Sequence, residues 1–93
     1  MVKPAKPAPR KRTYRSESRS APESAGVLVE LGQRIREIRI AARMTQEKTA
    51  QAAGVTFKHY QTIEGGKTNA TVTTLAAIAR ALGVGIGELF GKA

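Results

Sequence analysis

The side chains that carry out most enzyme chemistry are nearly absent from this sequence. It has no cysteine and no aspartate, and His59 is its single histidine. A disulfide framework, a thiolate metal site and a cysteine nucleophile are therefore excluded. One histidine cannot build a metal cluster. Since no acid–base or nucleophile constellation can be assigned, we expect no enzyme, no cofactor and no metal site.

Cationic side chains are the abundant chemical groups. Sixteen Lys and Arg residues against seven acidic residues give a net charge of +9. This charge favours a polyanionic partner, which is DNA, RNA or an anionic membrane surface, although a merely soluble basic protein has such a charge too. No apolar run approaches the ~18 residues of a spanning helix, and the N-terminus lacks the apolar core of a secretory signal. We expect a cytoplasmic, nucleoid-associated protein with no membrane partner.

Residues 1–26 differ in composition from the rest of the chain. They hold all four prolines and a serine cluster, and seven basic minus two acidic residues give +5. Because such a segment buries too little apolar surface to offset its ordering entropy, we expect a disordered basic arm. Three roles stay open for it: an inert solvated tail, an arm that grips phosphates or a groove, and a transit peptide. Its prolines disfavour the last role. The basic residues of the arm are Lys3, Lys6, Arg10, Lys11, Arg12, Arg15 and Arg19.

From Val27 onward, apolar residues recur at helical spacings of three and four, and no stretch alternates with period two. This pattern predicts an all-α domain of five short helices over residues 27–93. The first apolar stripe runs from Leu28 to Ala42, the fourth starts at Val72, and the last helix places Ile86, Leu89 and Phe90 against the core. After the helix that begins at Val27, the expected helices are Gln46–Ala53, Phe57–Glu64, Val72–Leu82 and Ile86–Phe90.

Threonines and glycines mark the helix boundaries. A threonine before each of the three middle helices is a candidate N-cap, since its hydroxyl accepts a bond from a free backbone N–H. Glycine follows each of these helices, because it adopts the left-handed conformation of a helix stop without steric cost. The caps are Thr45, Thr56 and Thr71, and the stops are Gly54, Gly65 with Gly66, and Gly83.

The segment 45–56 predicts a helix-turn-helix. Two helices joined by three or four residues cross steeply only where the contact is narrow, and Ala50 supplies a small side chain there. Gly54 supplies the positive φ of the turn, while Val55, Tyr60 and Ile63 pin the second helix to the first. The N-terminal half of the second helix then protrudes and is free to enter a major groove.

These residues resemble the Cro/C1-type (XRE-like) helix-turn-helix regulators related to lambdoid phage repressors. The resemblance covers about Leu31 to Phe90, and it implies a lambda-repressor-like fold. Its motifs are Leu31-Gly32-x-Arg34-Ile35, Arg39, Thr45-Gln46-Glu47, Ala50, Ala53-Gly54-Val55-Thr56, Ile63-Glu64-x-Gly66-Lys67, Asn69, Thr74-Leu75, Ile78-Ala79-x-Ala81-Leu82-Gly83-Val84 and Glu88-Leu89-Phe90.

The resemblance also implies roles in DNA reading. Gln46 would touch a phosphate and a base edge. Phe57, Lys58 and Thr62 would face the bases: Phe57 either meets thymine methyls or packs on a scaffold or partner, and Lys58 reads guanine or holds a phosphate. His59 and Gln61 would reach phosphates from the flanks of that face.

Further roles follow from the resemblance outside the recognition helix. Lys67 and Asn69, with backbone amides of their loop, would hold the neighbouring strand. Arg39 and Glu64 would form a buried ion pair between helices.

Five positions depart from the family pattern. Thr49 stands where leucine is usual and is expected to weaken the core, and Tyr60 needs a partner for its hydroxyl. Tyr60 is also a candidate to fill the space that Thr49 leaves. Arg43 is expected to have positive φ in place of glycine, Gly85 lacks a capping side chain, and Gly65 removes one customary phosphate contact.

The functional prediction is a sequence-specific double-stranded DNA-binding regulator of the Cro-like repressor, restriction-modification controller or antitoxin type. One such head is too small for operator-level specificity, so we expect a homodimer on a pseudo-palindromic operator. By resemblance its contact is formed by Val84, Ile86, Leu89 and Phe90. The alternative is a protein–protein adaptor on the same scaffold, either a bridging coactivator or a toxin-masking antitoxin. A toxin or the polymerase would be further partners.

Overall fold

The computed structural model describes residues 22–91, which form four α-helices and one 3-10 helix. Within this range there is no strand, and the predicted all-α class is confirmed. The elements are α2 (Pro22–Ala41), α3 (Gln46–Ala53), α4 (Phe57–Glu64), α5 (Val72–Leu82) and η1 (Ile86–Phe90).

The three middle helices begin and end where threonine and glycine predicted. Each N-cap threonine has extended backbone and accepts a hydrogen bond from the N–H three residues later: Thr45 from Lys48, Thr56 from His59 and Thr71 from Thr74. Gly54 and Gly83 end α3 and α5 in the left-handed conformation, with φ of 75° and 79°. Side-chain caps and glycine stops therefore define these three helices.

The first helix differs from its prediction in length and in starting point. α2 has 20 residues and begins at Pro22, ahead of the expected Val27. Proline is common at the first position of a helix, because the N–H that it lacks would have no partner there. The composition of residues 1–26 placed Pro22 in the predicted basic arm. That prediction was wrong for residues 22–26, which are helical. The rest of that predicted arm, residues 1–21, lies outside the described residues.

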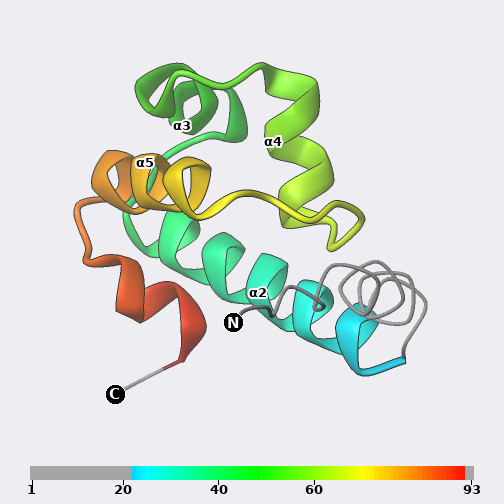
Figure 1. Cartoon of the computed structure of the whole chain (residues 1–93). Coiled ribbons are helices and arrows are strands. Elements are labelled where there is room, and N and C mark those ends of the chain that lie inside the picture. The colour runs from blue at the N-terminus through cyan, green and yellow to red at the C-terminus, as the bar shows by residue number, and fades with distance from the viewer. Residues whose placement is uncertain (1–21, 92–93) are drawn as a thin grey trace, which may run out of the picture.

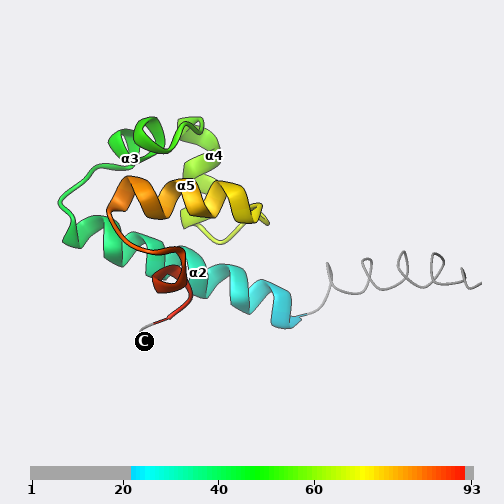
Figure 2. The same cartoon turned by 60° about the vertical axis from the view of Figure 1, so that its left-hand side comes forward.

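α2 forms the base of the molecule. In Figures 1 and 2, α5 lies above α2, α3 lies on the far side of α5, and α4 stands beside α5 with one end toward α2. α3 contacts both α4 and α5, α4 also contacts α2, and η1 contacts α2 and α5. The helix-turn-helix unit of α3 and α4 therefore lies at one end of the molecule, supported from below by α2 and α5.

An aliphatic core joins all five elements, and Tyr60 is its only buried aromatic side chain among the described residues. Every element contributes at least one residue that is less than 9% exposed. The core residues are Leu31, Ile35, Ala50, Tyr60, Ile63, Leu75, Ile78, Ala79, Leu82 and Leu89.

Three residues assigned to apolar stripes are exposed. Ala42 is exposed because it follows the end of α2, and Val72, the first residue of α5, is 69% exposed. Phe90 is 59% exposed although its neighbour Leu89 is fully buried. A 3-10 helix turns by about 120° per residue, so adjacent positions in η1 cannot both face the core. The prediction that Phe90 packs inward was wrong.

α2 and α4 approach each other closely at Gly32. A Cβ atom at this position would lie 2.3 Å from the carbonyl oxygen of Glu64 and 2.8 Å from that of Ile63. Because these atoms belong to the backbone, they cannot move aside without displacing α4. Gly32 therefore allows the end of α4 to rest directly on α2.

Candidate nucleic-acid interface

One side of α4 faces solvent. Its buried side consists of Tyr60, Ile63 and Glu64, which are three and four positions apart and so share one face of the helix. On the other side Lys58 and Gln61 are exposed. Phe57, at the start of the helix, is 44% exposed. The first turns of α4 thus offer a cation, an amide and an apolar ring to a partner.

Thr62 and His59 are less available than the sequence indicated. Both are half-buried, and the Thr62 hydroxyl donates to the His59 carbonyl at 2.7 Å. With its proton committed to the backbone, this hydroxyl can only accept from a partner. Thr62 therefore offers an acceptor and a methyl group to the outside.

Gln46 and Gln61 are linked to each other and to the interior. Gln46, the first residue of α3, is half-buried, and its Nε2 donates to Glu64 Oε1 at 2.9 Å. Gln61 Nε2 donates to Gln46 Oε1 at 3.4 Å. The two amides form a short chain from a buried carboxylate to the exposed side of α4.

The loop after α4 carries the exposed Lys67 and Asn69. The backbone amides that open this loop are already used: those of Gly65, Gly66 and Lys67 donate to carbonyls of α4 at 2.9–3.1 Å. These three N–H groups therefore have partners within the chain. The Lys67 and Asn69 side chains are exposed and are available to an anion.

Glu64 is the centre of a buried polar network. Arg39 Nε donates to Glu64 Oε2 at 2.6 Å, and Arg39 Nη2 donates to Oε1 at 3.3 Å. The Tyr60 hydroxyl donates to Oε2 at 2.6 Å. The side chains of Arg39 and Glu64 are 12% and 4% exposed, so the predicted buried ion pair is confirmed. Arg39 Nη1 also donates to the Met44 carbonyl at 2.9 Å, which ties the α2–α3 turn to the network.

The network shifts the ionisation of its members. Burial raises the pKa of Glu64, but the hydrogen bonds from Arg39, Tyr60 and Gln46 lower it more, so it lies below its ordinary value. The bond to Glu64 raises the pKa of Arg39. Burial, followed by the hydrogen bond to Glu64, raises the pKa of Tyr60. At neutral pH the pair is charged and the phenol is a donor.

The departures from the family pattern have local explanations. Thr49 is fully buried, and its hydroxyl donates to the Thr45 carbonyl at 2.9 Å, so the core holds no unpaired hydroxyl at this position. Tyr60 finds its partner in Glu64. Arg43 has a φ of 60°, as predicted, and Gly85 makes no side-chain cap to η1.

Sequence reasoning missed three features of this region. These are the bond from Tyr60 to Glu64, the bond from Gln46 to Glu64, and the close approach at Gly32. The first had a signal, because Tyr60 precedes Glu64 by four residues and side chains at that spacing meet on a helix. The other two join residues far apart in the sequence.

The part of the chain that the structure describes contains no cluster of three or more potential metal ligands. It also contains no helix long and apolar enough to cross a bilayer.

The chain is similar to known regulators over its helical part. A family model described as helix-turn-helix matches residues 35–89. The immunity repressor protein of Bacillus phage phi105 is 34% identical over 62 residues, which are 67% of this chain and 43% of that protein. An uncharacterized transcriptional regulator in the ATPase CF(0) region of Rhodospirillum rubrum is 38% identical over 60 residues, 64% of this chain and 56% of that protein. The chain thus spans about half the length of the curated relatives it matches.

A solved structure gives the same result for the fold. The restriction-modification controller protein C.AhdI from Aeromonas hydrophila superposes with a TM-score of 0.67 at 35% identity, covering 68% of this chain and 96% of that one. The family model, the relatives and the solved structure all indicate the same helix-turn-helix fold that the capped helices form. The chain belongs to the Cro/C1-type helix-turn-helix family of DNA-binding transcriptional regulators.

Proposed function

We propose that this chain binds a specific double-stranded DNA operator with α4 in the major groove. The observation that carries the proposal is the uncovered side of α4, where Lys58 and Gln61 are exposed while Tyr60 and Glu64 hold the opposite side to the core. In this docking Phe57, Lys58 and Thr62 face base edges. Gln46, His59, Lys67 and Asn69 approach phosphates on either side.

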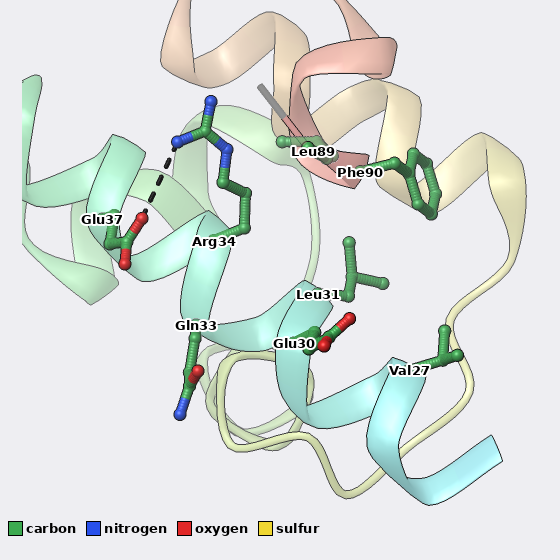
Figure 3. A pocket seen from close by; sticks show the side chains of 9 residues that line it. Val27, Glu30, Leu31, Gln33, Arg34, Glu37, Leu89 and Phe90 are labelled. Carbon is green, nitrogen blue, oxygen red and sulfur yellow. Dashed lines mark ion pairs between the residues drawn. The ribbon is translucent and has the colours of Figure 1, made fainter. Parts of the chain in front are cut away.

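We propose that the operator is pseudo-palindromic and is bound by a homodimer. Two apolar residues at the end of the chain support a contact there: Phe90 is 59% exposed, and Ile86 is half-buried. Figure 3 shows a hollow beside Phe90, with Leu89 and Phe90 of η1 on one side and Val27 and Leu31 of α2 on the other. Val84 is half-buried like Ile86, whereas Leu89 is fully buried and belongs to the monomer core.

The biological role fits that of a repressor, a restriction-modification controller or an antitoxin. The seven basic residues of the predicted arm add phosphate affinity without base preference, because phosphate contacts carry no sequence information. α2 and the elements that follow it form the reading domain. A protein–protein adaptor on the same scaffold, with a toxin or the polymerase as partner, is the second candidate. A chain that acts only as such an adaptor would bind no specific operator in the presence of excess competitor DNA.

The test compares two lysines. Lys58→Ala should cost about 1–3 kcal/mol and relax the preference at one operator position, because a lysine–base contact is lost. Lys67→Ala should weaken binding to all sequences alike and reduce the salt slope by about one contact, because a phosphate contact is lost. The measurement is a binding matrix over all single-base changes of a selected operator, at two salt concentrations.

The matched control is Arg80→Ala, which removes one positive charge from a residue without a proposed contact. Equal, uniform losses for both lysine variants would make Lys58 a phosphate contact. Loss of base preference from Lys67→Ala would reverse the docking of α4. If the wild-type chain selects no DNA sequence, the proposed function is wrong.

A further inference from the structure

We propose that Gln61 reads the exocyclic amino group of an adenine or a cytosine in the major groove. We further propose that Gln46 is a positioning residue, which fixes the orientation of the Gln61 amide. Both statements rest on the proposed docking of α4. They change the role of Gln61 from a phosphate contact to a base contact.

The first step is the orientation of the Gln46 amide. An ionised carboxylate only accepts hydrogen bonds, and Glu64 is ionised because Arg39 and Tyr60 donate to it. Gln46 therefore turns its NH2 group toward Glu64, as its 2.9 Å contact has it. The reverse orientation would place two acceptor oxygens against each other beside a buried charge. The oxygen of Gln46 consequently points away from the network.

The second step transfers this orientation to Gln61. The outward oxygen of Gln46 is an acceptor only. Gln61 Nε2 donates a hydrogen bond to it at 3.4 Å. A contact of this length is weak, but it favours one of the two orientations of the Gln61 amide. The nitrogen of Gln61 faces Gln46, and its oxygen faces outward.

The third step is the match to a nucleic-acid group. Gln61 is exposed and follows Phe57 and Lys58 by four and three residues, so it lies on the same side of α4. Phosphate oxygens only accept, so at a phosphate only the remaining N–H of Gln61 would have a partner and its outward oxygen would have none. In the major groove the donors are adenine N6 and cytosine N4. One N–H of Gln61 remains after its bond to Gln46, and with the oxygen it can span N7 and N6 of adenine.

The experiment is a double-mutant cycle on base preference. Binding matrices are measured for the full chain and for Gln46→Ala, Gln61→Ala and the double variant. Gln61→Ala should reduce discrimination at one base pair by roughly 10-fold. Gln46→Ala should reduce discrimination at that same base pair, and the double variant should lose no more there. The control is Arg80→Ala on α5, an exposed residue without a proposed contact.

The matrix also identifies the base. If the affected position prefers adenine, placing 7-deazaadenine there should weaken wild-type binding and leave Gln61→Ala unchanged. If it prefers cytosine, the amino group alone is read. Melting curves of all four proteins show whether a loss comes from unfolding, which would affect every operator position.

Two results would overturn the inference. A uniform loss for Gln61→Ala over all sequences would make it a phosphate contact, while a wild-type preference at other positions would leave the proposed function standing. Effects of Gln46→Ala and Gln61→Ala at different base pairs, adding in the double variant, would remove the positioning role. If the wild-type chain selects no sequence, the proposed function falls and this inference falls with it.

Discussion

The chain makes nearly the same backbone turn twice, once between α3 and α4 and once between α5 and η1. Gly54 and Gly83 have φ/ψ of 75°/26° and 79°/24°. In each turn the next residue is valine, and its N–H donates at 3.0 Å to a carbonyl five residues back. Thr56 and Gly85 then have nearly the same extended conformation. The direction of the chain is thus set in the same way at both places.

The helices that follow these turns nevertheless differ. After Thr56, whose hydroxyl accepts from His59 N–H at 3.1 Å, comes the eight-residue α-helix α4. After Gly85, which has no capping side chain, comes the five-residue 3-10 helix η1. The turn alone does not decide which helix forms. The cap satisfies an N–H that would otherwise have no partner in the first turn of α4.

α2 also holds the two helices in different ways. Arg39 forms the buried ion pair with Glu64 at the end of α4. Arg34 Nε donates to the Glu88 carbonyl of η1 at 2.9 Å, in an exposed position. A buried pair with further donors fixes α4 in one arrangement, which the proposed docking of α4 needs. An exposed bond to one carbonyl restrains η1 less.

The largest expected effect concerns the two arginines. Arg39→Met alone and Glu64→Gln alone should each lower the free energy of unfolding by about 3–5 kcal/mol, because each leaves an uncompensated buried charge or polar group. The double variant should recover part of this loss. Arg34→Met should cost about 1 kcal/mol or less, as expected for one net hydrogen bond. Denaturant unfolding of the four proteins measures the difference.

Acid unfolding provides a second measurement of the same comparison. Because the pKa of Glu64 is lowered on folding, its stabilising effect is present above the ordinary carboxyl pKa of 4.5 and is lost as the pH falls below it. The Glu64→Gln variant should lack this part of the acid dependence, whereas Arg34→Met should retain it. Small, additive effects of Arg39→Met and Glu64→Gln would contradict the coupling.

A medium effect tests whether the turns are equivalent. Neither Gly54 nor Gly83 has an atom within 4 Å of an added Cβ. Alanine at either position should therefore cost only the strain of the left-handed conformation, about 1–2 kcal/mol. We expect the two losses in thermal unfolding to agree within a few tenths of a kcal/mol. A much larger loss at one position would show that the turns are held differently despite their common shape.

The smallest effects concern the caps. Thr56→Ala should destabilise the domain by about 1 kcal/mol, because the His59 N–H loses its acceptor. Gly85→Ser should stabilise it by a few tenths of a kcal/mol by supplying the missing cap. Chemical denaturation measures both. No loss for Thr56→Ala would mean that the cap is not what distinguishes α4 from η1.

Local chemistry made much of this fold predictable from sequence. The bounds of α3, α4 and α5 depend on a threonine and a glycine beside each helix, and both act within a few residues. The positive φ of Arg43 and the Arg39–Glu64 pair were also predicted, by resemblance to the family. The start of α2 was missed because Pro22 has opposite meanings in a disordered arm and at the first position of a helix.

Long-range packing accounts for what could not be predicted. Helical spacing tells which residues share a face, but not whether another element covers that face, so Val72 and Phe90 were assigned to the core. The use of Gln46 by Glu64 depends on how α3 crosses α4. The bond from Gln61 to Gln46 depends on the same crossing.

Because α2 contacts Glu64 at two positions, the structure limits which insertions and deletions α2 can tolerate. Gly32 lies against the carbonyl of Glu64, and Arg39 binds its carboxylate. These two positions are seven residues apart, about two helical turns, and therefore share one phase of α2. A codon inserted or deleted between them would rotate one contact by about 100° relative to the other. The same change ahead of Gly32 would leave both contacts in phase, so in-frame length variation among natural relatives should be rarer between Gly32 and Arg39 than ahead of Gly32.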